Sequence, residues 1–216
     1  DYFKGTLPEF PAGKPLFIFA SHFHADHYAP VIFQLGEKRE NVFYILSKEI
    51  GKKIPEEYRK RYKDRIRLVK AGERFCLNIS EESLIVETFH STDEGVAFWL
   101  SCEGKEIYHA GDLNNWWWEG EDMAWNRNMA ASYKQEMKKL SGRTADLAFI
   151  PVDPRQEQWF YLGVAGFMEQ ADTKWIFPMH FWEDYTIIPK LIEHPASEGW
   201  RDRIVEIHKE GEEFIR

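Results

Sequence analysis

Short apolar runs recur along this 216-residue chain and alternate with segments whose apolar residues have helical spacing. Runs rich in β-branched and aromatic side chains predict strands at 16–20, 42–46, 65–69, 83–89, 95–101, 105–109, 146–150, 174–178 and 203–207. The helical spacing predicts helices near 29–36, 55–63, 122–140 and 161–172. The consecutive strands between 65 and 109 indicate antiparallel hairpins, so the pattern predicts an α+β fold.

The stretch His22-Phe23-His24-Ala25-Asp26-His27 follows the first apolar run and contains three imidazoles and a carboxylate. Imidazole nitrogens and carboxylate oxygens are good ligands for zinc and related metals. In extended chain, residues i and i+2 point to the same side, so His22 and His24 can converge on one ion. A turn after His24 would bring Asp26 and His27 to a second ion. The stretch therefore predicts part of a metal site.

Three later strand-like runs also lead into a histidine or an aspartate. The run at 83–89 leads into His90, the run at 105–109 into Asp112 and the run at 174–178 into His180. Loops at one edge of a sheet are where scaffolds usually carry their chemistry. These strand ends therefore predict one shared site.

This order of residues resembles the metallo-β-lactamase superfamily of metallohydrolases. The His-x-His-x-Asp-His signature, a later single histidine, a Gly-Asp pair and a final histidine supply these positions: His22, His24, Asp26, His27, His90, Asp112 and His180. The resemblance implies that His22, His24 and His90 hold one divalent metal ion. It implies that Asp26, His27 and His180 hold a second ion, and that Asp112 bridges the two.

For the fold, the resemblance implies a four-layer αββα sandwich that forms a single domain over residues 1–216. Within the superfamily, the chain looks most like stand-alone hydrolases similar to the ascorbate-6-phosphate lactonases. Superfamily members usually have a β-hairpin and an acidic turn before the signature, whereas little chain precedes His22 here. The expectation is a sandwich that lacks this hairpin.

A dinuclear site of this kind predicts hydrolytic chemistry. Two divalent ions about 3.5–4 Å apart can share a water, lower its pKa toward neutrality and present a bridging hydroxide to a carbonyl or phosphorus. Asp26 is the predicted catalytic residue, because a ligating carboxylate can also orient that hydroxide. The expected reaction is cleavage of an ester, lactone or phosphoester bond in a small molecule. Zinc is the first expectation for the metal, and the nitrogen and oxygen ligands would also accept manganese or iron.

Three alternatives remain open. A phosphodiesterase or nuclease of the same fold is disfavoured by the formal net charge of −8, because nucleic-acid binding needs a basic face. An iron-dependent redox protein is disfavoured because superfamily members of that type carry an acidic residue where this chain has His24, and a flavin domain. A non-catalytic metal-binding module is the third alternative.

Composition sets the remaining expectations. Cys76 and Cys102 do not make a disulfide framework, and both are expected to be buried thiols in a reducing cytoplasm. No apolar run is long enough to span a bilayer, so no membrane partner is expected. The net charge of −8 is the reason that no nucleic-acid partner is expected. The oligomeric state is not readable from the sequence.

Other polar and aromatic residues have open interpretations. Outer partners of the metal-binding histidines are expected among Asp93, Asp153 and Glu183, each of which could equally be a solvated charge or a helix cap. Structural roles are expected for His109, His194 and His208, although His109 could reach the outer shell of the site. Four tryptophans follow Asp112 and could anchor a helix or form an aromatic wall over the metals: Trp116, Trp117, Trp118 and Trp125.

Overall fold

The computed structural model describes residues 1–216 apart from residues 2–8, 12, 38, 80–81 and 216. Its strands are β1 (Leu16–Ala20), β2 (Val42–Ser47), β3 (Ile66–Val69), β4 (Arg74–Ile79), β5 (Glu82–His90), β6 (Val96–Cys102), β7 (Lys105–His109), β8 (Thr144–Pro151) and β9 (Asp172–Met179). Its α-helices are α1 (Ile32–Glu37), α2 (Glu56–Arg61), α3 (Met123–Lys138), α4 (Leu162–Gln170) and α5 (Ile187–Glu193).

The strands form two sheets. The smaller sheet has the order β1-β2-β3 with all strands parallel. The larger sheet has the order β4-β5-β6-β7-β8-β9, antiparallel from β4 to β7 and parallel from β7 to β9. The antiparallel series therefore begins at β4, while the predicted strand at 65–69 pairs in parallel with β2.

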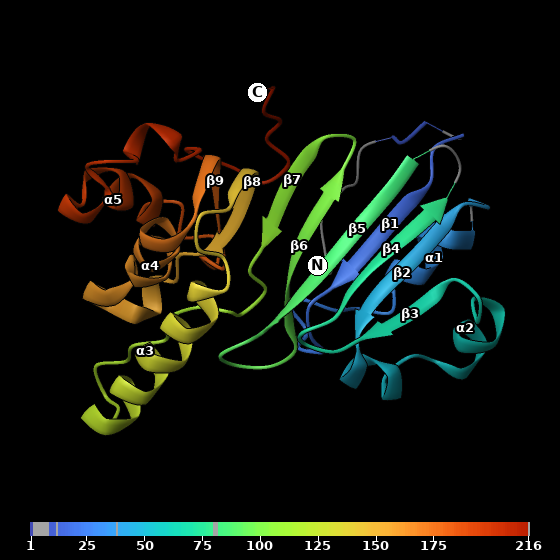
Figure 1. Cartoon of the computed structure of the whole chain (residues 1–216), viewed down its shortest axis with the longest axis horizontal. Helices are drawn as coiled ribbons and strands as arrows, with labels where there is room; N and C mark the ends of the chain where they lie inside the picture. The colour runs from blue at the N-terminus through green and yellow to red at the C-terminus, as the bar shows by residue number, and fades with distance from the viewer. Residues whose placement is uncertain (2–8, 12, 38, 80–81, 216) are drawn as a thin grey trace.

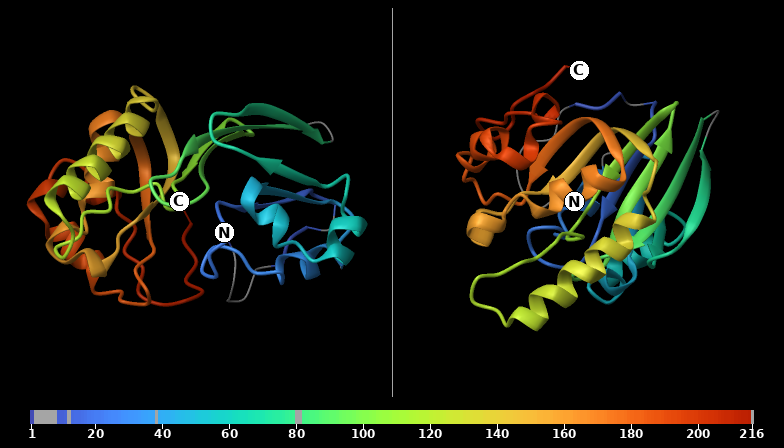
Figure 2. Two further views of the ribbon diagram at one scale, coloured as in Figure 1. Left: turned by 90° about the horizontal axis from the view of Figure 1, so that it is seen from below. Right: turned by 60° about the vertical axis from the view of Figure 1, so that its left-hand side comes forward.

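The sheets pack face to face, and helices cover their outer faces. Along β1, Phe17 and Phe19 contact the apolar layer between the sheets, whereas Ile18 and Ala20 belong to the cluster beneath α1 and α2. This alternation follows from the two-residue period of a strand. On the far side, α3, α4 and α5 pack against the larger sheet. Figures 1 and 2 show the resulting four layers, the expected αββα sandwich.

Most predicted elements are present, with three differences. The strand predicted at 203–207 is wrong, because a 3₁₀ turn covers Arg201–Arg203 and only Ile204 forms a bridge, to Ile176. Two elements, β4 and α5, are not in the prediction. On β4, Arg74 and Cys76 face outward from the edge of the larger sheet, so the apolar run is broken.

The cysteine prediction is also partly wrong. Cys76 is exposed because it lies on the outward face of the edge strand β4, and Cys102 is partly buried. Neither cysteine forms a disulfide.

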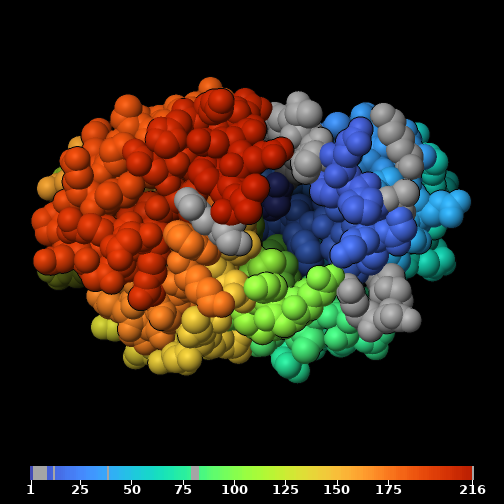
Figure 3. Space-filling view, turned by 90° about the horizontal axis from the view of Figure 1, so that it is seen from above, coloured from blue at the N-terminus to red at the C-terminus, as the bar shows by residue number. Residues whose placement is uncertain are grey.

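The surface is hollowed between the two halves of the chain. Figure 3 shows a depression between the blue N-terminal residues and the red C-terminal residues. An apolar groove of about 350 Å³ is lined by Leu16–Phe19 of β1 and by Phe98, Ile107 and Phe149 of the larger sheet. Among the described residues, no helix is long and apolar enough to cross a membrane.

Candidate metal centre

Three strand ends bring six of the seven predicted ligands together. His22, His24, Asp26 and His27 lie on the loop after β1, Asp112 follows β7, and His180 follows β9 directly. These residues form two groups. Within each group, every residue offers one nitrogen or oxygen atom, and these atoms lie within 4.8 Å of one another. One group contains His22, His24 and Asp112, and the other contains Asp26, His27 and His180.

Within each group, the nitrogen and oxygen atoms lie close together. In the first group, Nε2 of His22 is 2.9 Å from Nδ1 of His24 and 3.4 Å from Oδ2 of Asp112. In the second, Oδ2 of Asp26 is 3.4 Å from Nε2 of both His27 and His180. Such separations are those of ligands that share one ion, since bonds of about 2.0–2.2 Å place ligand atoms roughly 3–3.5 Å apart.

Asp112 lies between the two groups. Its Oδ2 faces His22, whereas its Oδ1 is 3.1 Å from Nε2 of His27 and 3.6 Å from Nε2 of His180. The carboxylate is almost fully buried. One carboxylate thus presents an oxygen to each group, which is the geometry of a bridging ligand.

Two buried atoms of this centre have no hydrogen-bond partner among the described residues. These atoms are Nε2 of His27 and Oδ1 of Asp112, which lie 3.1 Å apart without forming a hydrogen bond. Unpaired buried polar atoms are costly unless a partner satisfies them. A divalent cation bound by both atoms would supply that partner.

The protonation state of the centre also suits metal binding. Burial, and then the neighbouring His27, lower the pKa of His22 from 6.5 to about 3, which keeps the imidazole neutral. Burial raises the pKa of Asp112, but His27, His180 and His22 outweigh it and hold the pKa below 3.8. Neutral imidazole and ionised carboxylate are the forms that bind metals.

Carboxylates behind the centre orient two of the histidines. Oδ2 of Asp153 is 2.9 Å from Nδ1 of His180 and also accepts a hydrogen bond from Arg155. Oδ2 of Asp1 is 2.7 Å from Nδ1 of His27. Each contact leaves Nε2 of the histidine directed at the centre, as outer-shell carboxylates do in metal sites.

Asp153 is one of the predicted outer partners, and it lies behind His180. Asp1, which lies behind His27, is not among the predicted partners. Asp1 also accepts hydrogen bonds from the backbone N–H and the hydroxyl of Ser21. Asp1 therefore contacts both Ser21 and His27 of the loop after β1. No local pattern marks Asp1 as a partner of His27, because the two are far apart in the sequence.

The backbone after β9 is held in an unusual conformation. His180, Trp182 and Glu183 all have positive φ angles, of 64°, 51° and 63°. Residues other than glycine rarely adopt this region, and such strain gathers at functional sites. Here the turn directs His180 toward Asp26 and Asp112 and directs Trp182 over the pocket.

His90 lies outside both groups. Its side chain is exposed at the end of β5, and its Nδ1 is 2.5 Å from the backbone oxygen of Ser91. It lines a different surface pocket, beside Gln135 and Glu136 of α3. Asp93, from the same loop, instead lies close to the first group, with its Oδ2 4.0 Å from Nδ1 of His24.

The remaining histidines have structural contacts. Nδ1 of His109 accepts a hydrogen bond from the backbone of Gly111, and its Nε2 lies 3.9 Å from Oδ2 of Asp1, behind His27. Nδ1 of His194 accepts a hydrogen bond from the backbone of Ala196, and His208 contacts Glu212.

A pocket of about 410 Å³ opens over the centre. Its lining includes His24, Asp26, Asp93, Asp112 and His180. Its walls add Trp116, Trp118, Trp125, Met129, Arg155 and Trp182.

The tryptophans after Asp112 divide between two roles. Trp116 is nearly buried, and its indole N–H donates to the backbone oxygen of Asp112, so it supports the backbone at that residue. Trp118 stacks on Trp116, and Trp125 is exposed at the pocket. Trp117 packs on Trp159 instead.

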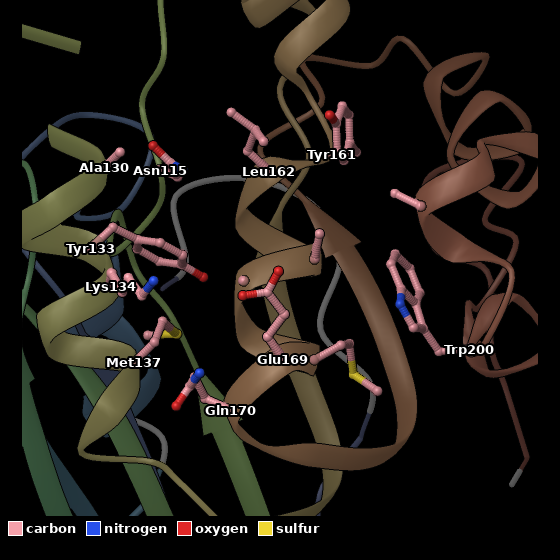
Figure 4. A pocket seen from close by; sticks show the side chains of 14 residues that line it. Asn115, Ala130, Tyr133, Lys134, Met137, Tyr161, Leu162, Glu169, Gln170 and Trp200 are labelled. Carbon is pink, nitrogen blue, oxygen red and sulfur yellow. The ribbon is translucent and has the colours of Figure 1, made fainter. Parts of the chain in front are cut away.

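A larger cavity, of about 560 Å³, lies between α3 and α4 and contains none of the predicted ligands. Figure 4 shows Tyr133 and Lys134 of α3 facing Glu169 and Gln170 of α4 across it. No described residue of its lining forms a histidine and aspartate cluster, so the chemistry of the chain points to the smaller pocket.

Comparisons with known proteins place the fold. No family model and no curated protein matches the sequence. Among solved structures, CmlA, a diiron β-hydroxylase from Streptomyces venezuelae, is similar with a TM-score of 0.55 at 12% identity over 92% of this chain. The metallo-β-lactamase fold protein YhfI from Bacillus subtilis is similar with a TM-score of 0.50 at 13% identity over 93% of this chain. The chain has the metallo-β-lactamase fold.

The chain spans 44% of the length of CmlA and 77% of the length of YhfI. At these identities the similarity concerns the fold, which agrees with the family resemblance of the sequence.

Proposed function

We propose that this protein is a dinuclear metal-dependent hydrolase that cleaves an ester, lactone or phosphoester bond in a small molecule. The observation that carries the proposal is the placement of Asp112, whose two carboxylate oxygens face separate histidine-containing groups beneath an open pocket. Asp26, His27 and His180 would hold one ion together with Asp112. His22 and His24 would hold the other together with Asp112.

The chemistry of the ligands is compatible with zinc, manganese or iron, because the groups offer imidazole nitrogen and carboxylate oxygen without thiolate. When bound, two such ions would lower the pKa of a water toward neutrality and polarise the substrate oxygen. No serine or cysteine nucleophile is required for this chemistry.

Asp26 would orient the attacking water. Its side chain is one quarter exposed and lines the pocket, and its Oδ2 faces the second group. It can therefore accept a hydrogen bond from a water above the centre while it ligates below. Asp153 and Asp1 would keep His180 and His27 fixed during the reaction.

The pocket walls support a substrate that combines a planar or apolar group with an anionic group. Exposed faces of Trp125 and Trp182 offer apolar contact. Arg155 lies over Trp182, 4.6 Å from the ring centroid, and about half of its side chain is exposed. Its guanidinium could pair with a carboxylate or phosphate of the substrate. A lactone or ester of a phosphorylated sugar is therefore the first substrate class to assay.

The test is elemental analysis of the purified protein together with a panel of chromogenic esters, lactones and phosphodiesters. Two equivalents of divalent metal and cleavage of one class are expected. Asp26→Ala should keep the fold by circular dichroism and lose turnover. The matched control is Asp64→Ala, which removes an exposed carboxylate between α2 and β3 and should keep the activity.

Three outcomes would contradict the proposal. Bound metal with no turnover on any class would favour a non-catalytic metal-binding module. Iron with oxygen consumption would favour redox chemistry. A near-native rate for Asp26→Ala would remove the role of that carboxylate.

A further inference from the structure

The two ligand groups are unequal. The second group has three side chains of its own in addition to the shared Asp112, whereas the first has only His22 and His24 besides Asp112. The predicted additional ligand, His90, does not reach the first group. Its ring lies against the oxygen of Ser91, and its backbone N–H donates to Glu136 of α3.

The loop between β5 and β6 presents a different side chain to the first group. Asp93 Oδ2 is 4.0 Å from His24 Nδ1, and Asp93 lines the pocket over the centre. This separation is only slightly longer than the roughly 3–3.5 Å expected between ligands on one ion. The Asp93 side chain is about half exposed, so it has room to rotate toward His24.

The backbone on both sides of Asp93 is held against the centre. The hydroxyl of Thr92 donates to the backbone oxygen of Asn114 and accepts from the backbone N–H of the same residue. On the other side, the N–H of Val96 donates to the oxygen of Ser21, directly before His22. The loop therefore fixes the position of Asp93 relative to both other segments of the site.

Charge also favours a carboxylate at this position. Two divalent cations carry four positive charges in total, while the ligands Asp26 and Asp112 supply one negative charge each. A third carboxylate reduces the uncompensated charge, which a neutral imidazole such as His90 does not do.

We propose that Asp93, rather than His90, completes the first metal site. The inference rests on the proposed dinuclear centre. Each ion would then have two imidazoles and two carboxylates, counting Asp112 at both. An oxygen-rich set of this kind shifts the preference from zinc toward manganese and iron, compared with a site that has a third histidine.

The experiment compares Asp93→Asn with His90→Ala. Each purified variant is stripped of metal, titrated with Co²⁺ while the visible absorption is recorded, and analysed for manganese, iron and zinc after reconstitution. Wild type and His90→Ala should bind two equivalents. Asp93→Asn should keep one tight equivalent and bind the other at least about tenfold more weakly. Asp93→Glu should restore part of that loss.

Circular dichroism and thermal melting of the metal-free variants separate a folding defect from a ligand defect, and Asp93→Asn preserves the side-chain shape. Loss of one equivalent in His90→Ala with two retained in Asp93→Asn would overturn the inference while leaving the dinuclear centre intact. Two equivalents in wild type without hydrolysis of any substrate would overturn the proposed function and leave the assignment of Asp93 standing. Absence of metal binding in wild type would overturn both.

Discussion

Asp153 accepts a hydrogen bond from His180 at 2.9 Å through an oxygen that also pairs with Arg155. The carboxylate is fully buried, and burial raises its pKa. Hydrogen bonds from His180 and Arg155 outweigh burial and bring the pKa down to about 2. Asp153 is therefore an anion at neutral pH that fixes both the orientation and the tautomer of His180.

The first prediction is that Asp153→Asn weakens one metal site. An amide can still accept a hydrogen bond, but it lacks the charge that makes His180 a stronger ligand. Metal affinity at the second group should fall on the order of 10- to 100-fold, while the first group keeps its ion. Metal titration of the stripped protein measures this.

The control is Asp146→Asn on β8. Asp146 also accepts hydrogen bonds from a cation, Lys174, and from a backbone N–H, that of Glu106. It is not part of the centre. Equal metal affinities for the two variants would show that Asp153 does not support His180.

The apolar pattern predicts the elements that carry the centre because each is a locally encoded strand. The run at 16–20 predicts β1, which has the same bounds in the structure, and the runs leading to Asp112 and His180 predict β7 and β9. A strand whose apolar pattern is interrupted is not predicted in this way. On β4, outward-facing Arg74 and Cys76 alternate with half-buried Phe75, so the edge strand lacks a continuous apolar run.

The second prediction concerns the close approach of the β5–β6 loop to the loop after β1. Gly95 has φ +73°, and a Cβ there would lie 1.9 Å from the backbone oxygen of Ser21. Gly104 has a similar φ of +71° with nothing within 4 Å of a Cβ. Gly104→Ala should lower the free energy of unfolding by roughly 1–2 kcal/mol, which is the cost of a left-handed backbone conformation at a residue with a Cβ.

Gly95→Ala should lower the free energy of unfolding clearly more than Gly104→Ala does. It should also weaken metal binding, because Ser21 must move and His22 with it. Urea unfolding of both variants, combined with metal titration, measures the two effects. Equal losses of stability would mean that the contact with Ser21 relaxes without cost.

Contacts between remote segments are the part of the centre that the sequence does not predict. Four strand ends with histidine or aspartate predict a common site, and the ends of β1, β7 and β9 meet as expected. The placement of His90 depends on a loop conformation that no residue pattern encodes. The same holds for the contact of Asp1 with His27 and for the choice of Asp153 among the possible outer partners.

The third prediction is a pH dependence of the metal-free protein. The pKa of His22 is about 3 in the folded state, because burial and His27 lower it, against 6.5 as the ordinary value. Between these values the unfolded chain binds a proton that the folded protein does not bind. The free energy of unfolding should therefore fall as the pH decreases from 6.5 to 3, by up to about 1.4 kcal/mol per pH unit from this group.

His22→Gln removes the titrating group while keeping a polar side chain. With a chelator present, the stability of this variant should depend less steeply on pH than that of wild type over the same range. Urea midpoints at several pH values between 3 and 7 provide the comparison. Parallel curves for the two proteins would show that His22 is not held neutral by burial.

The fourth prediction is that Trp182 contributes to substrate binding and little to stability. Its side chain is 53% exposed, yet it contacts the guanidinium of Arg155 and the ring of His180 at the pocket. Trp182→Ala should change the free energy of unfolding by less than about 0.5 kcal/mol. For a substrate with a planar or apolar group, KM should rise roughly 2- to 12-fold with a smaller change in kcat, because one aromatic contact contributes about 0.5–1.5 kcal/mol.

Trp117→Ala is the matched control, since Trp117 packs on Trp159 and does not line the pocket. Its KM should equal that of wild type. Metal content must be the same in both variants, because Trp182 also contacts His180. A wild-type KM for Trp182→Ala would show that the exposed tryptophan does not contact the substrate. A rise in KM for Trp117→Ala as well would mean that loss of either tryptophan acts through the fold of the loops around the pocket, and Trp182 would have no specific role in substrate binding.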